Sequence, residues 1–242
     1  YFWPAVEQYV ECTHEYWRSN GKFTPNITLR LASGGYIGGG LYHSQNLEGA
    51  LTTLPGARIV CPSFADDAAG LLRTSMRSKG FTLYLEPKAL YNSVEAAAVV
   101  PEEFEVPFGK ARIRREGTDL TIITYGNTTH FCLDVAERLA REGVGSVEVI
   151  DLRSLIPLDK EAIFASVRKT GKVMVVHEDK VFSGFGAEIA AQIAGEMFRY
   201  LDAPVQRVGS TFTPVGFNPI LERAILPNDE KIYKAAKELL EF

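Results

Sequence analysis

The sequence predicts an α/β fold with mainly parallel, doubly wound sheets. Two observations predict this class: in the second half of the chain short apolar strands alternate with amphipathic helices, and three further strand-like runs precede them. The stretch between them holds prolines, several acids and no clear period, as expected of a connection between domains. With 242 residues, 46% of them hydrophobic, we predict a domain over residues 1–100, a linker over 101–117 and a second domain over 118–242.

The first domain is expected to open with a helix. Pro4 stands where proline is tolerated at a helix start, apolar residues follow at helical spacing to Trp17, and Gly21 ends the run. Ser63 and Asp66 have the spacing of a capping box, which predicts the start of another helix. The other elements expected here are strands at 27–31, 57–61 and 81–87 and a helix at about 46–53.

The second domain alternates cleanly between strands and helices. The expected strands are 120–125, 146–152, 172–177 and 204–208. The expected helices lie near 128–142, 159–169, 185–199 and 228–240. This alternation predicts a mainly parallel sheet with helices on its faces.

Composition excludes several classes of function. The net charge is −4 and the basic residues are scattered, so we expect neither a nucleic-acid partner nor a membrane surface. No apolar run has the length of a membrane span, and no secretory signal leads the chain. Cys12, Cys61 and Cys132 lie far apart, which argues against a disulfide framework or a zinc site and fits a reducing compartment.

The segment Ala32–Gln45, ASGGYIGGGLYHSQ, contains five glycines within seven positions. It has neither the spacing of a phosphate loop nor that of a dinucleotide fingerprint. Glycine is costly in backbone entropy, so such a run requires an unusual loop path or a close approach of the backbone to another group. A ligand-binding loop and a tight structural crossing both fit this pattern.

His43 ends this glycine loop and is a candidate catalytic residue. An imidazole titrates near neutral pH and can move protons, bind a metal or cap a helix, and a purely structural histidine is the alternative. His14, His130 and His177 rank lower, because they fall on a helix, in a first helical turn and at the end of an apolar strand. Their spacing matches no metal motif.

A second glycine-containing segment, Val181–Gly195, opens onto a predicted helix. Its free amides would suit an anion, but glycine there is equally explained by close packing between loop and sheet. Glu178 and Asp179 directly before it are candidate acid–base groups, with solvated loop carboxylates as the alternative.

Several motifs occur in one order along the chain: GGGLYHSQNLEG, GARIVCPS, LYLEPKALY, EVIDLRSLIPLD, VVHED, GFGAEIAAQIA and ILERAILP. Together they strongly resemble the beta subunit of the thiamine-diphosphate-dependent decarboxylating component of 2-oxoacid dehydrogenase complexes, and GLYHSQ most resembles the branched-chain type. The resemblance covers essentially the whole chain. It implies part of a pyrimidine-binding domain followed by a transketolase-type C-terminal domain with α/β/α layers.

The resemblance also implies functional residues. His43 matches an active-site histidine that assists proton transfer as the acyl group passes to the lipoyl group, and Tyr1 matches an aromatic residue that packs on the aminopyrimidine ring. Backbone carbonyls hold a structural potassium ion in many members. The matching positions, of which Pro25, Ser78 and Gly80 depart from the usual residues, are Pro25, Ile27, Thr28, Ser75, Ser78 and Gly80.

The implied cofactor is thiamine diphosphate with magnesium, bound mainly by the partner alpha chain and by an upstream part of the pyrimidine domain. That upstream part carries the activating glutamate of the family, and no residue here matches it. We therefore expect the isolated chain to be inactive. We also expect the strand segments at 27–31 and 81–85 to present unpaired apolar edges.

The expected function is oxidative decarboxylation of a 2-oxoacid, branched-chain in type, with acyl transfer to a lipoyl transacylase. The resemblance implies three partners: an alpha subunit or fused alpha portion, a second beta chain, and the transacylase core. It implies a bacterial cytoplasm or a mitochondrial matrix as the location. An acetoin dehydrogenase or transketolase-like beta chain and a non-catalytic assembly module are the alternatives.

Overall fold

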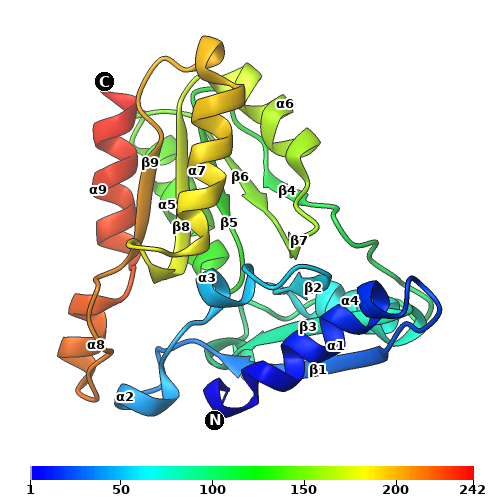
Figure 1. The fold of residues 1–242 in the computed structure, drawn as a ribbon. Helices are drawn as coiled ribbons and strands as arrows, with labels where there is room; N and C mark the ends of the chain where they lie inside the picture. The colour runs from blue at the N-terminus through cyan, green and yellow to red at the C-terminus, as the bar shows by residue number, and fades with distance from the viewer. Residues whose placement is uncertain (1) are drawn as a thin grey trace.

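The computed structural model describes residues 2–242, so Tyr1 lies outside the described part of the chain. Two sheets organise it (Figure 1): a four-stranded sheet in the order β1-β3-β2-β7 and a five-stranded sheet in the order β4-β6-β5-β8-β9. Most neighbouring strands run parallel. The predicted α/β class is confirmed.

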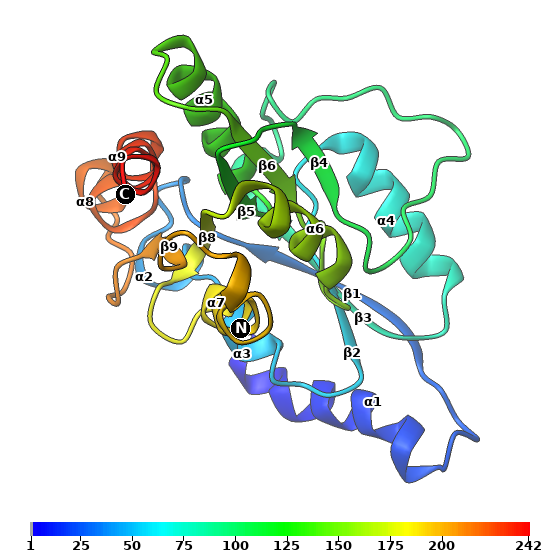
Figure 2. The same cartoon turned by 90° about the horizontal axis from the view of Figure 1, so that it is seen from above.

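The smaller sheet is built from β1 (Asn26–Ser33), β3 (Gly80–Pro87), β2 (Ala57–Val60) and β7 (Ser154–Ile156). Helices α1 (Val6–Arg18) and α4 (Ala65–Arg77) lie on opposite sides of it (Figure 2). Alternate side chains of the strands divide between the two faces: Leu83 joins the core cluster that includes Tyr9 of α1, and Tyr84 joins the cluster that includes Leu71 of α4. A short 3-10 turn, η1 (Trp3–Ala5), leads into α1.

Two expectations for this region were wrong. The strand at 81–87 is not an edge, because β3 lies between β1 and β2. Ser63 does not cap α4: Phe64 holds the N-cap position, and the Ser63 hydroxyl instead donates to Asp151 Oδ1 at 2.9 Å. A buried hydroxyl is satisfied equally well by a carboxylate from the other half of the chain, and tertiary packing determined which partner it takes.

The larger sheet holds β4 (Arg112–Arg115), β6 (Val147–Asp151), β5 (Leu120–Thr124), β8 (Val173–Lys180) and β9 (Gln206–Ser210). One core cluster joins its strands to α5 (Thr128–Arg141) and α9 (Asp229–Leu240), and another joins them to α6 (Lys160–Thr170) and α7 (Phe185–Glu196). Figure 2 shows these helix pairs on opposite sides of the sheet. Strands buried on both faces explain the continuous apolar runs in this half of the sequence.

Several elements were not predicted. Strand β4 lies inside the range expected to be linker and pairs antiparallel with β6. The predicted domain boundaries stay a prediction. The helix expected at 46–53 is limited to α3 (Glu48–Leu51). The other unpredicted elements are α2 (Gly40–His43), α8 (Pro219–Ile225), β7, η2 (Lys88–Leu90) and η3 (Phe198–Tyr200).

The two halves share one apolar core and a buried ionic network. The larger core cluster contains Leu83 of the small sheet together with Val175 of the large one. Asp67 of α4 is fully buried and accepts a hydrogen bond from Arg153 Nη1 at 2.7 Å, and Arg114 joins Asp67 to Asp151. The relative position of the halves is therefore fixed by packing and by paired buried charges. Among the helices of residues 2–242, none is long and apolar enough to cross a bilayer.

Candidate functional site

The glycine loop connects β1 to α2 and is held by carboxylates from the second half of the chain. Gly35 N–H donates to Glu178 Oε1 at the end of the large sheet. The amides of Ile37 and Gly38 donate to Glu222 of α8 at 3.2 and 3.3 Å. Three of the loop amides are thus occupied by carboxylates of the same chain.

Two close approaches in this loop favour glycine. Gly34 has a φ of +83°, and a Cβ there would lie 2.8 Å from Glu178 Oε1. A Cβ at Gly35 would lie 2.7 Å from Leu226 Cδ1. The close approach anticipated from the glycine run is therefore made to a carboxylate and a leucine of the same chain, which supports the structural-crossing interpretation for this part of the loop.

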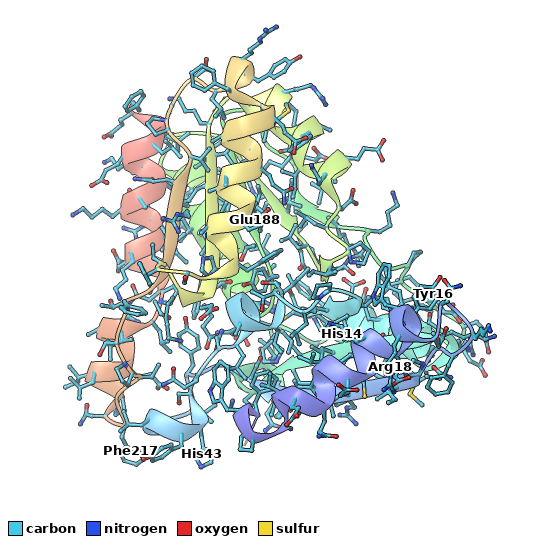
Figure 3. The ribbon with its side chains drawn as sticks, in the orientation of Figure 1. His14, Tyr16, Arg18, His43, Glu188 and Phe217 are labelled. Carbon is cyan, nitrogen blue, oxygen red and sulfur yellow. The ribbon has the colours of Figure 1, made fainter. Side chains whose placement is uncertain are left out.

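His43 lies at the C-terminal end of the short helix α2 and is exposed. Its neighbour Tyr42 is 86% exposed. Phe217 is 75% exposed and approaches the start of α2: a Cβ added at Gly40 would lie 3.5 Å from the Phe217 Cβ. Figure 3 places His43 and Phe217 at the same end of the molecule. An imidazole in this position is open to a substrate that approaches from outside the chain.

Glu178 and Asp179 are not solvated loop carboxylates, as the alternative supposed, but buried residues of β8. Burial raises the pKa of Glu178 to about 7, and the hydrogen bond from Gly35 opposes this rise. Asp179 Oδ2 accepts from Gly49 N–H at 2.9 Å. Burial, followed by the nearby charge of Asp179, raises the pKa of Glu48 well above its usual value. These acids join the two halves and lie beneath the loop rather than at an open site.

The three lower-ranked histidines are either packed against other residues of the fold or distant from the glycine loop. His177 is fully buried, with its ring stacked on Tyr125 at a centroid distance of 6.3 Å, and burial lowers its pKa to about 4. His130 Nε2 is 2.8 Å from the Ser63 carbonyl oxygen. His14 is exposed on α1, away from His43 (Figure 3).

The second glycine loop also has a packing explanation. A Cβ at Gly186 would lie 2.3 Å from two atoms of the His177 ring. Glycine at the start of α7 therefore lets this helix approach β8 closely. This supports the close-packing alternative for Val181–Gly195 over an anion site.

The residues proposed for potassium gather at one end of the small sheet. Asn26, between Pro25 and Ile27, pairs with Gly80 in the parallel β1–β3 ladder, and Ser75 and Ser78 lie at the end of α4 just before β3. The Arg58 guanidinium reaches the same place: its Nη2 would lie 2.9 Å from a Cβ at Gly80. The geometry brings the predicted segments together, and the Arg58 guanidinium lies beside them.

The described residues do not fit the diphosphate end of thiamine diphosphate. The amides of Gly35, Ile37 and Gly38 in the glycine loop donate to Glu178 and Glu222 and so are not available to a bound anion. Across residues 2–242 no group of three or more His, Cys, Asp or Glu side chains is placed to hold a metal ion. Tyr1, the residue matched to the aminopyrimidine contact, lies outside the described residues.

The two mainly parallel sheets define an α/β protein, and two comparisons identify its type as that of transketolase. The family model for the C-terminal domain of transketolase matches residues 109–232. A solved structure described as a split-gene transketolase in an inactive beta4 tetramer has a TM-score of 0.74 at 21% identity, over 98% of this chain and 73% of that one, and so shows the same fold.

Sequence relatives narrow the family further. The chain is 40% identical to the 2-oxoisovalerate dehydrogenase subunit beta of Bacillus subtilis over 99% of its length and 73% of that protein. It is 39% identical to the pyruvate dehydrogenase E1 component subunit beta of the same organism, over 93% of this chain and 69% of that protein. The corresponding Staphylococcus aureus subunit is 41% identical, with 93% and 68% covered. The chain belongs to the family of beta subunits of 2-oxoacid dehydrogenase E1 components.

Sequence reasoning did not identify every residue that shapes this loop. Glu222 and Tyr36 were not singled out, although ILERAILP, which contains Glu222, was among the family motifs. The Tyr36 hydroxyl donates to the Pro227 carbonyl at 2.6 Å, and the residue adopts a φ of +62°. Sequence reasoning offered no signal that would have paired residues so distant along the chain.

Proposed function

We propose that this chain acts as the beta subunit in the oxidative decarboxylation of a branched-chain 2-oxoacid, with transfer of the acyl group to a lipoyl group. The observation that carries the proposal is the 40% identity with 2-oxoisovalerate dehydrogenase subunit beta along nearly the whole chain. The exposed His43 at the end of the glycine loop adds chemical support, because it provides a proton-transferring group at an accessible position.

In this proposal the alpha subunit, or a fused alpha portion, supplies the magnesium and diphosphate contacts. The occupied glycine loop and the lack of a metal-binding cluster within residues 2–242 support this division. Bound thiamine diphosphate supplies an electron sink for the loss of carbon dioxide. The isolated chain is then inactive toward 2-oxoacids.

His43 acts at the transfer step. When a lipoyl disulfide is opened, one sulfur takes the acyl group and the other leaves as a thiolate that needs a proton. An imidazole held near that sulfur donates the proton, a contribution that is typically about 10²–10⁴-fold for a positioned acid–base group. The exposure of His43 suits an acceptor that arrives on a flexible arm from another protein.

Two surfaces support the proposed assembly. Around His43, exposed apolar residues suit a contact with the alpha partner: Ile37, Leu41, Tyr42, Phe217, Ile220 and Leu221. On α7, small side chains line an open hollow of about 670 Å³ that the exposed Phe198 and Phe242 also border, and we assign this face to the second beta chain. Because the lipoyl acceptor belongs to the transacylase core, that core is the third partner. A structural potassium ion near Gly80 is part of the same proposal, supported by the pairing of β1 with β3.

The test is a His43→Ala variant in the assembled enzyme, with decarboxylation to an artificial electron acceptor and acylation of a lipoyl domain measured separately. We expect acylation to fall by at least about 100-fold while the artificial-acceptor rate changes little, because only the former needs the proton. The exposed His14→Ala variant is the matched control. Equal losses in both assays would contradict the role of His43.

A further inference from the structure

We propose that Glu222 is a positioning residue for the transfer step, holding the glycine loop so that α2 presents His43 correctly. This inference rests on the proposed function, since it assigns a second residue to the same reaction. It is carried by a juxtaposition: a buried carboxylate of α8 accepts hydrogen bonds from the loop that ends at His43.

Glu222 lies within α8 and is 7% exposed. Its Oε1 accepts from Ile37 N–H at 3.2 Å, and both of its oxygens lie 3.3 Å from Gly38 N. Two successive amides therefore converge on one carboxylate. A buried charge needs such partners, and amide donors bind a carboxylate more strongly than a neutral acceptor.

The cations nearest to Glu222 in sequence have other partners. Arg223 Nη2 donates to Asp229 Oδ1 at 2.9 Å. Lys231 Nζ donates to the carbonyls of Ala224 and Leu226 at 2.6 and 2.8 Å, at the C-terminal end of α8. These contacts hold α8 in place and leave the Glu222 carboxylate directed at the loop.

The same C-terminal segment contacts the loop on both sides of Glu222. The Tyr36 hydroxyl donates to the Pro227 carbonyl, and Phe217 approaches Gly40. Gly38 and Gly40 have φ values of +63° and +64°, which glycine adopts readily, so these two residues do not themselves restrict the path of the loop. Support for the loop therefore comes mainly from a segment more than 170 residues away in sequence, since Glu222 is 185 positions from Ile37.

Positioning matters because proton transfer falls steeply with misplacement of the donor: a shift of about 1 Å can cost about 100-fold. Helix α2 has only four residues and no side-chain cap, so its orientation depends on the loop before it. The Glu222 carboxylate binds the loop close to α2. The other loop contacts are made by neutral groups, or by Glu178 at the end of the loop farther from α2.

The test compares Glu222→Gln with Glu137→Gln, an exposed glutamate of α5, as the matched control. Amide hydrogen exchange on the purified full chain comes first. Replacing the charged acceptor by a neutral one is expected to speed exchange at Ile37 and Gly38 by at least about tenfold, with no change in β6 and no effect of Glu137→Gln. Unchanged exchange at both amides would overturn the contact.

Kinetics of the assembled enzyme then separate positioning from folding. For Glu222→Gln we expect lipoyl acylation to fall by about 10- to 100-fold with the artificial-acceptor rate within about twofold of the control. Glu222→Asp, which keeps the charge, should recover part of the lost acylation rate. Equal losses in both partial reactions, or none, would overturn the positioning role. If the wild-type and Glu137→Gln enzymes themselves fail to turn over 2-oxoacids, the proposed function is wrong, and with it the role of Glu222 in that reaction. This failure differs from a failure of the Glu222 contact, because the hydrogen-exchange experiment tests the contact without any turnover.

Discussion

Gly49 provides a sharp test of how the two halves pack. It lies in α3 beside the loop that opens α7, and its amide donates to Asp179 Oδ2 at 2.9 Å. A Cβ at this position would lie 2.4 Å from the Ser183 carbonyl oxygen and 3.1 Å from Gly184 Cα. Both are backbone atoms, so the overlap cannot be relieved by rotating a side chain. The substitution Gly49→Ala must move α3 away from the second half of the chain.

The expected change in the free energy of unfolding of Gly49→Ala is the sum of opposing effects. Overpacking of this kind costs about 1–3 kcal/mol, and a weakened bond to a buried carboxylate adds about 1–3 kcal/mol. Higher helix propensity of alanine returns at most about 1 kcal/mol. We expect Gly49→Ala to lower the free energy of unfolding by about 2–4 kcal/mol in urea denaturation followed by circular dichroism. The control Gly195→Ala, where a Cβ meets nothing within 4 Å in α7, should raise it by about 0.5–1 kcal/mol. A Gly49→Ala protein as stable as wild type would refute the described packing of α3 against this loop.

The remaining predictions concern buried charges. Because the pKa of Glu178 is raised to about 7 in the folded chain, the folded state holds a proton that the unfolded state releases, and stability falls as pH rises from 4.5 to about 7. The Glu178→Gln protein should therefore gain stability relative to wild type as pH rises over that window, by up to about 1.4 kcal/mol per pH unit. If the free energies of unfolding of the two proteins change in parallel with pH, titration of Glu178 is not the cause. The Asp67→Asn change should lower the free energy of unfolding by about 3 kcal/mol, because it weakens a fully buried acceptor of Arg153 and Arg114, whereas Asp66→Asn at a more exposed pair should cost under about 1 kcal/mol. Similar losses for the two aspartates would count against the buried network.

Much of the fold could be predicted from the sequence because its periodic elements are long and buried. The strands predicted at 120–125 and 146–152 are observed as β5 and β6 within a residue or two. The short elements were missed. Helix α2, with four residues, and the three-residue strand β7 carry too few residues for a period to be recognised, and β7 forms only because β2 offers it an antiparallel partner.

The site was harder to predict than the fold. His43 could be selected from its sequence context, and Figure 3 shows it at the surface. The partners of its loop could not, because Glu178 and Glu222 come from β8 and α8, far along the chain. Reading Glu178 as a solvated loop carboxylate failed for the same reason: the strand extends to Lys180, and the residues after its apolar run are buried by the glycine loop. Contacts between distant segments leave no local periodicity in the sequence.

The measurement that tests the central claim most directly is calorimetric titration of thiamine diphosphate with magnesium. It should be made on this chain alone and on this chain assembled with its alpha partner. We predict binding and turnover of branched-chain 2-oxoacids only in the assembly, because the amides of Ile37 and Gly38 already donate to Glu222 and, in the proposed division, the alpha partner supplies the diphosphate and magnesium contacts. Tight binding by the chain alone, or an assembly that binds the cofactor without decarboxylating any 2-oxoacid, would contradict this account.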